Sequence, residues 1–173
     1  MKTKYLLLAT ALLTLCGGCA TVAPVAAPSF AVESEWDDAA SSTLLVDGRA
    51  TLTGQAFLKT RGGDVKVGAG EIVHLYPSTG YVRELLEIQS TGYTPTNYGD
   101  AERKRMLALV RKTVADAEGR FSFESLPAGE FIVSCDIFWE IPGLYGMMER
   151  TGSRVSKPVV LAAGETVTVM LTL

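Results

Sequence analysis

The chain has 173 residues, a formal net charge of −3 and a hydrophobic content of 47%. This length suits one ordinary domain after a targeting segment and leaves little room for two, because domains typically hold about 100–150 residues. The mild excess of acidic residues argues against a nucleic-acid partner, which would favour a basic face.

The first 18 residues have the pattern of an export signal. Lys2 and Lys4 precede an apolar stretch from Tyr5 to about Leu15. That stretch is too short to cross a bilayer as a helix, which needs about 20 residues. A basic start, a short apolar run and small residues after it are typical of a secretory signal peptide. We therefore predict that residues 1–18 are removed, which leaves 14 basic and 19 acidic residues.

Small residues precede a cysteine at the end of this signal. Gly17 and Gly18 have no side-chain bulk, so a peptidase can reach the bond before Cys19. The segment resembles the bacterial lipobox, in which cleavage leaves a cysteine whose thiol carries diacylglycerol, although Cys16 stands where that pattern usually has Leu. The resemblance implies that acyl chains on Cys19 anchor the protein in the bacterial cell envelope. Ala20, in place of the Asp of the enterobacterial sorting pattern, implies the outer membrane.

Two alternatives stay open for this segment. Cys16 could be the lipidated residue, with Leu13 at the favoured position, although Leu15 immediately before it is bulky for a cleavage site. The segment could also be an ordinary secretory signal that is cleaved after a small residue.

Residues 19–42 are rich in Pro, Ala and Ser, and Pro24 and Pro28 block regular hydrogen bonding. This composition predicts a semi-extended linker between the lipidated cysteine and the folded domain. Trp36 is the unusual residue of the segment. We expect its side chain to dock on the domain or on a partner.

Residues 43–173 alternate short β-type runs with turns that contain Gly or Pro. In these runs apolar side chains recur at every second residue, as expected for strands with one buried face. The clearest runs are Arg49 to Lys59, Glu71 to Tyr76, Arg120 to Phe123, Phe131 to Cys135 and Glu165 to Leu173. Several short strands with regular turns in one domain predict two packed antiparallel sheets.

An insertion at 78–111 interrupts this pattern. Apolar residues recur at helical spacing from Tyr81 to Ile88 and again from Met106 to Val110, with Asp100 as the predicted cap of the second run. We predict two short helices joined by a polar, turn-rich loop.

The run from Val114 to Cys135 combines glycine turns, an aromatic pair and an apolar strand in a specific order. The positions that carry this arrangement are Asp116, Gly119, Phe121, Phe123, Leu126, Pro127 and Gly129. The arrangement resembles carboxypeptidase regulatory-like domains, and the flanking runs fit that family's opening and closing strands over most of residues 48–173. The resemblance implies a mostly β, seven-stranded antiparallel sandwich of the transthyretin-like or immunoglobulin-like type, here with the short helical insertion. Such domains usually serve as accessory modules.

The sequence predicts no catalytic, metal or cofactor site. His74 is the single histidine, whereas a mononuclear catalytic zinc site commonly takes two or three. We expect His74 to lie on a strand face with a local hydrogen bond. Cys135 lacks a base close by in the sequence, which favours a buried core thiol over a nucleophile. Neither a nucleophile-elbow motif nor a phosphate-binding glycine loop is present. We therefore predict a protein that is not an enzyme.

A basic cluster on the second predicted helix is the first candidate for partner binding. It contains Arg103, Lys104, Arg105, Arg111 and Lys112. Such a cluster could contact anionic lipid heads or an acidic partner, and the alternative is a solvated helical face.

The segment from Asp136 to Met148 is the second candidate, because it is densely apolar and aromatic. Trp139, Tyr145, Met147 and Met148 could form an exposed patch, which often marks a partner site. The alternative is that these side chains pack in the core.

These features together predict a membrane-anchored, non-enzymatic envelope lipoprotein without a small-molecule cofactor, whose sandwich binds a protein or glycan partner. The alternative is a structural lipoprotein subunit that docks an envelope-spanning, secretion-type assembly to the outer membrane. No sequence motif identifies the partner.

Overall fold

The computed structural model of the protein describes residues 30–173. The predicted signal peptide, Cys19 and the first part of the predicted linker lie outside these residues. Over the described part of the chain, every helix is too short or too polar to span a bilayer.

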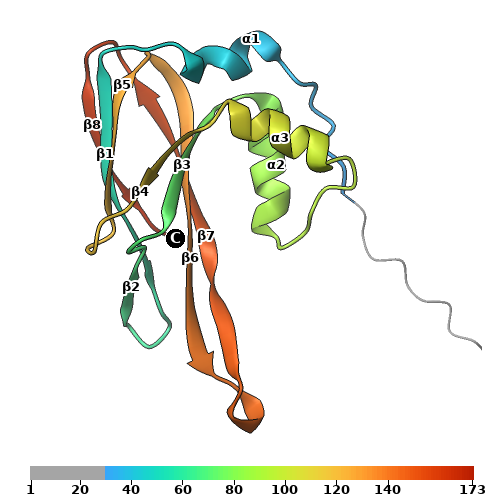
Figure 1. The fold of residues 1–173 in the computed structure, drawn as a ribbon, viewed down its shortest axis with the longest axis vertical. Coiled ribbons are helices and arrows are strands. Elements are labelled where there is room, and N and C mark those ends of the chain that lie inside the picture. The colour runs from blue at the N-terminus through green and yellow to red at the C-terminus, as the bar shows by residue number, and fades with distance from the viewer. Residues whose placement is uncertain (1–29) are drawn as a thin grey trace, which may run out of the picture.

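Two sheets of four strands each pack face to face (Figure 1). The first has β1 (Ala50–Lys59) at its centre, with β8 (Thr166–Leu171) along one edge and β5 (Arg120–Leu126) and β2 (Val65–Val67) along the other. The second has the order β4 (Arg111–Val114), β3 (Ile72–Pro77), β6 (Gly129–Pro142) and β7 (Met148–Leu161). The predicted mostly β sandwich is confirmed. Residues 30–173 form eight strands rather than seven, and β1 and β8 run parallel while the other pairs are antiparallel.

The main core lies between the two sheets, where alternate side chains of each strand meet. Along β1 every second residue is buried, which is the pattern of a strand with one solvated face. Phe121 and Phe123 on β5 contact each other with ring centroids 6.1 Å apart, and both are buried. Cys135 is a free thiol that is 1% exposed. The buried strand face predicted for the run from Arg120 to Phe123 and the core position predicted for Cys135 are confirmed.

The insertion folds into α2 (Gly80–Ser90) and α3 (Asp100–Ala108), as predicted. Both helices lie on the outer side of the β4-β3-β6-β7 sheet at one end (Figure 1). A second, smaller core joins them to the sheet, and its buried members are Val32, Tyr81, Val82, Leu85, Leu86, Met106 and Ile132. The predicted cap at Asp100 is wrong by one residue. Gly99 precedes the helix, and its N–H donates to the carboxylate of Glu102 at 3.0 Å.

The prediction of a linker over residues 19–42 is wrong for residues 30–42, which belong to the folded domain. Val32 is 6% exposed, and its backbone N–H and C=O bond the Asn97 side chain at 2.9 and 2.8 Å. The carboxylate of Glu84 accepts the N–H groups of Glu33 and Ser34, each at 2.8 Å. These partners come from the insertion, so the composition of the N-terminal segment alone does not reveal them.

Trp36 docks on the domain, as predicted. Its ring lies 5.0 Å from that of Tyr81 in an edge-to-face arrangement, and the Arg105 guanidinium lies 4.5 Å from its centroid. The chain then forms α1 (Asp38–Ser41) and the 3-10 turn η1 (Ser42–Leu45) before it enters β1.

Strands β6 and β7 form a long hairpin that extends beyond the rest of the sandwich (Figure 1). Their register runs without a break from the pair Gly129–Leu161 to the pair Pro142–Met148. A short turn with the 3-10 segment η2 (Leu144–Gly146) closes the tip. The outer face of this hairpin next to α2 is the surface on which the candidate site lies.

Candidate functional site

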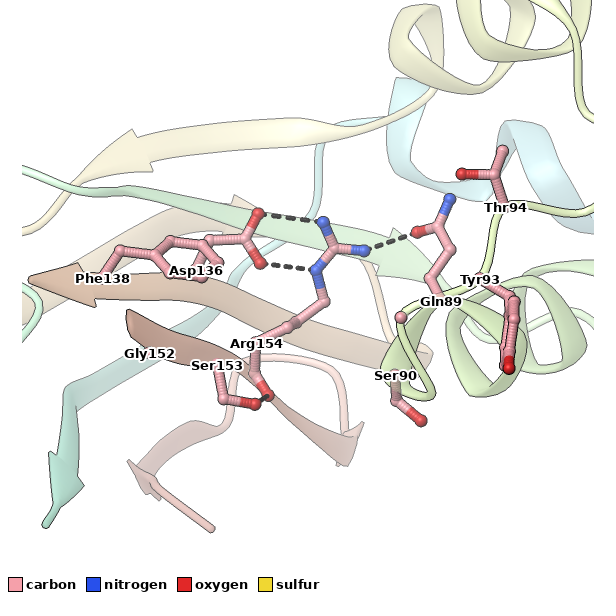
Figure 2. A pocket seen from close by; sticks show the side chains of 10 residues that line it. Gln89, Ser90, Tyr93, Thr94, Asp136, Phe138, Gly152, Ser153 and Arg154 are labelled. Atoms are coloured by element: carbon pink, nitrogen blue, oxygen red, sulfur yellow. Dashed lines mark hydrogen bonds and ion pairs between the residues drawn. The ribbon is translucent and has the colours of Figure 1, made fainter. Parts of the chain in front are cut away.

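A pocket of about 430 Å³ lies between the C-terminal end of α2, the loop that follows it, and the outer face of the β6–β7 hairpin. We call it the Arg154 pocket. The side chains that matter for its chemistry are Gln89, Tyr93, Asp136, Phe138 and Arg154 (Figure 2).

The strand alternation of β6 explains why polar and aromatic groups reach this pocket. Val133, Cys135 and Ile137 are buried in the main core, so Asp136 and Phe138 face outward. The hairpin register places Arg154 opposite Asp136 and Gly152 opposite Phe138. A Cβ atom on Gly152 would lie 2.1 Å from the Ile137 carbonyl oxygen and 2.8 Å from the Phe138 ring. The absence of a side chain at Gly152 thus leaves space for the Phe138 ring.

Arg154 is the centre of a hydrogen-bond network in the pocket. Its Nε and one Nη donate to the two carboxylate oxygens of Asp136 at 2.6 and 2.9 Å, and the other Nη donates to Oε1 of Gln89 (Figure 2). The two charged side chains are only 29% and 39% exposed. The hydrogen bonds from Arg154 hold the pKa of Asp136 below its ordinary value and raise the pKa of Arg154. Both groups are therefore charged at neutral pH, and their charges cancel.

The network keeps hydrogen-bonding capacity for a ligand. A guanidinium has five N–H groups, and three of those on Arg154 are used in the bonds above. A carboxylate offers about four acceptor positions, of which Asp136 uses two on Arg154. Within residues 30–173, the amide Nε2 of Gln89 donates no hydrogen bond. The pocket therefore offers donors and acceptors side by side without a net charge.

Aromatic rings flank this network. In Figure 2 the Phe138 ring lies on one side of Arg154 and the Tyr93 ring on the other. Tyr93 is 43% exposed, and the Phe30 ring supports it at a centroid distance of 5.1 Å. The Arg150 guanidinium lies 4.2 Å from the centroid of Phe138 and covers part of that ring. Flat apolar surfaces at both sides of a polar centre are suited to a ligand with both apolar and hydroxylated faces.

The predicted basic cluster is divided between α3, which carries Arg103, Lys104 and Arg105, and β4, which carries Arg111 and Lys112. Arg103 and Lys104 are exposed on α3, but Arg105 pairs with Asp38 and stacks on Trp36. Arg111 belongs to β4 instead of the helix. Its guanidinium bonds the carbonyl oxygens of Leu44, Val46 and Ser125 at 2.9–3.0 Å and the Asp47 carboxylate at 2.9 Å. Arg105 and Arg111 thus fix the N-terminal segment to the domain.

The predicted apolar patch exists at the tip of the β6–β7 hairpin, without one of its expected members. Tyr145, Met147 and Met148 are 97%, 69% and 57% exposed, and Leu144 beside them is 76% exposed. Trp139 is the exception, because it faces inward and packs against the main core. The patch lies at the free end of the hairpin, away from α2.

His74 lies on the outer face of β3, as the alternation predicts. Its ring stacks on Tyr76 with centroids 5.8 Å apart. The expected local hydrogen bond to another protein group is not formed within residues 30–173. Partial burial and the neighbouring Lys112 lower the pKa of His74. In the described part of the chain, no group of three His, Cys, Asp or Glu side chains could hold a metal ion.

Sequence analysis missed the Arg154 pocket. Its polar residues come from two strands and a helix, and β7 was not among the predicted strands. The available signal was the alternation in β6, where Ser134, Asp136 and Phe138 occupy the positions between inward-facing residues. An aspartate on the outer face of a central strand would have directed attention to the partner across the hairpin.

No family model matches the chain, and no curated protein matches it. A solved structure does. It comes from Pseudomonas aeruginosa and is described as a candidate carbohydrate binding protein. The match has a TM-score of 0.63 and 23% sequence identity, and covers 78% of this chain and 93% of the other. The two proteins share the fold. The resemblance to carboxypeptidase regulatory-like domains therefore stays a prediction at the level of the family.

Proposed function

We propose that the protein is a non-enzymatic glycan-binding module and that the Arg154 pocket holds a sugar. The observation that carries this proposal is the charge-balanced network of Asp136, Arg154 and Gln89 between two aromatic rings. Neighbouring sugar hydroxyls each donate and accept, so a pair of them matches a carboxylate and a guanidinium that lie side by side. The C–H faces of a pyranose ring match the exposed aromatic surface.

The described lining of the Arg154 pocket contains one carboxylate, which favours binding over hydrolysis. Glycosidases generally use two carboxyl groups, one of which must be protonated to act as an acid. Asp136 supplies the carboxylate of the pocket lining within residues 30–173, and its lowered pKa keeps it ionised. The carbohydrate-binding description of the protein with the same fold is consistent with this proposal.

Calorimetric titration of the full chain with sugars selected on a glycan array tests the proposal. We expect Asp136→Ala and Tyr93→Ala each to weaken binding at least about tenfold, because each removes a principal contact. Tyr145→Ala is the matched control, since it removes an exposed tyrosine at the distant hairpin tip. Binding that is unaffected by Asp136→Ala and Tyr93→Ala would exclude this pocket as the site.

Anchoring through Cys19 to the bacterial envelope, at the outer membrane, remains part of the proposal. It rests on the sequence pattern of the first 20 residues. Two acyl chains hold a protein stably at a bilayer. We expect Cys19→Ser to abolish palmitate labelling and to release the protein from the membrane fraction, whereas Cys16→Ser leaves the lipid labelling in place. Retention of the label in the Cys19→Ser variant would contradict the anchor.

A second candidate function is docking to an envelope protein, as a structural lipoprotein subunit would. The hairpin tip favours it, because Leu144, Tyr145 and Met147 expose apolar surface at the end of a projecting hairpin. Crosslinking from a photoreactive residue at position 145 tests this candidate, with a photoreactive residue at position 124 on the opposite sheet as the control. Equal crosslinking yields from the two positions would exclude the hairpin tip as a docking surface for an envelope protein.

A further inference from the structure

A second pocket lies directly beside the first along β7. It has a volume of about 360 Å³ and lies between α2 and the continuation of β7. Leu86, Ile132 and Pro158 give it an apolar lining, and we call it the Pro158 pocket. Arg154 and Ser90 line both pockets. The two pockets are therefore neighbours separated by the Arg154 side chain and the last turn of α2.

The strand geometry gives the span of the two pockets together. Gly152 and Arg154 border the first pocket, and Arg154, Ser156 and Pro158 border the second. Six residue steps along a strand cover about 20 Å. This span is several times the width of one pyranose ring.

From this arrangement, and resting on the proposed function, we infer that the two pockets are consecutive subsites for one uncharged oligosaccharide. The chain of sugars runs along β7, with one unit in the Arg154 pocket and further units in the Pro158 pocket. Arg154 contacts the units on both sides, because it lines both pockets.

The charges along this path favour a neutral ligand. Asp136 neutralises Arg154 through two hydrogen bonds. The lining of the Pro158 pocket adds the positive side chains Arg83 and Lys157 and the negative side chain Glu87. The guanidinium of Arg83 also donates hydrogen bonds to the carbonyl and hydroxyl oxygens of Ser78 at 2.9 and 3.2 Å. The described lining of the two pockets thus holds three cationic and two anionic side chains, and an excess of one positive charge favours an uncharged glycan over a polyanionic one.

The apolar lining of the Pro158 pocket suits the C–H faces of the additional units. Burial of such surface adds affinity in proportion to the area removed from water. Affinity should therefore rise with the number of sugar units until both pockets are filled, and stay constant after that.

Titration of the full chain with cello-, malto-, xylo-, manno- and chito-oligosaccharides of one to six units tests this inference. In the series that binds, we expect affinity to increase at least about tenfold between one and four units. Glu87→Trp should abolish this increase by filling the Pro158 pocket, while the affinity for the single sugar stays within about twofold. Glu124→Trp, which makes the same substitution at an exposed glutamate on the opposite sheet, should leave the increase unchanged.

The outcomes separate this inference from the proposed function. Equal affinity for one and six units overturns the two-subsite inference and leaves the single-sugar site intact. The measurement on the unmodified chain gives this result even where Glu87→Trp does not fold. Tighter binding of oligogalacturonate than of every neutral series overturns the uncharged class. Failure to bind any series overturns the proposed function and the inference with it.

Discussion

The Asp136–Arg154 pair should contribute measurably to stability, and its coupling energy can be worked out from its surroundings. Exposed ion pairs are worth about 0.2–1 kcal/mol, whereas breaking a buried pair costs about 3–5 kcal/mol. The two side chains are 39% and 29% exposed and make two hydrogen bonds to each other. Their coupling energy should therefore lie between the two classes, at about 1–2 kcal/mol.

A double-mutant cycle with Asp136→Ala and Arg154→Met measures this coupling. Urea unfolding of the four proteins gives the free energies, and at a slope of about 2 kcal/mol per molar the coupling corresponds to about 0.5–1 M in the urea midpoint. The control cycle uses Asp116→Ala and Arg120→Met, because that pair makes a similar Nε contact of 2.9 Å, with Asp116 44% and Arg120 62% exposed. If the two cycles gave the same coupling energy, partial burial of the Arg154 network would have no energetic effect and our reasoning would be refuted.

Three further predictions concern other parts of the domain. Trp36→Ala should destabilise the protein by about 1–3 kcal/mol in urea unfolding, since the ring packs on Tyr81 and is half-buried. A change in the free energy of unfolding below about 0.5 kcal/mol would instead fit a solvated linker. Burial raises the pKa of Cys135 to about 12, so a disulfide reagent at pH 8 should modify this thiol only after unfolding. Rapid labelling of the native domain would contradict the position of Cys135 in the core. The pKa of His74 in the folded state is lowered from 6.5, so the unfolded chain binds the proton first as the pH falls. The free energy of unfolding should therefore decrease below about pH 6.5, and this decrease should be smaller in His74→Gln. Identical pH profiles of the two proteins would contradict the burial of this ring.

The sandwich could be predicted because its strands carry a local signal. In β5 the side chains of Phe121 and Phe123 repeat at the strand period, and the glycine turns at Gly119 and Gly129 mark its ends. The two helices of the insertion were also predictable from apolar spacing. The parallel pairing of β8 with β1 was not, because it joins residues more than 100 positions apart and no local pattern specifies such a partner.

The boundary of the domain could not be predicted, because its stabilising contacts are distant in sequence. Glu84 and Asn97 from the insertion bond the backbone of residues 32–34, and Tyr81 receives Trp36. Because the composition up to residue 29 is rich in Pro and Ala, the few residues after it that pack against the domain could not be distinguished from a linker by composition alone. The helical insertion thus positions the N-terminal segment as well as one wall of the Arg154 pocket.

The candidate site was harder to predict than the fold. Asp136 and Arg154 are 18 residues apart and meet only because the hairpin register pairs them, and Gln89 joins them from α2. Sequence analysis found the exposed residues at the hairpin tip, where apolar character is unusual in itself. A charge-balanced polar network has no comparable local signature.

Nuclear magnetic resonance of the isotope-labelled protein tests the location of the sugar most directly. During titration with the tightest-binding neutral oligosaccharide, the side-chain signals of Gln89 Nε2 and Arg154 Nε should shift first, together with the backbone amides of Tyr93 and Ser156. We expect the amides of residues 144–147 at the hairpin tip to stay unchanged. Shifts confined to the tip or to the β2-β1-β5 sheet, with the signals of Gln89 and Arg154 unmoved, would contradict a glycan site in the Arg154 pocket.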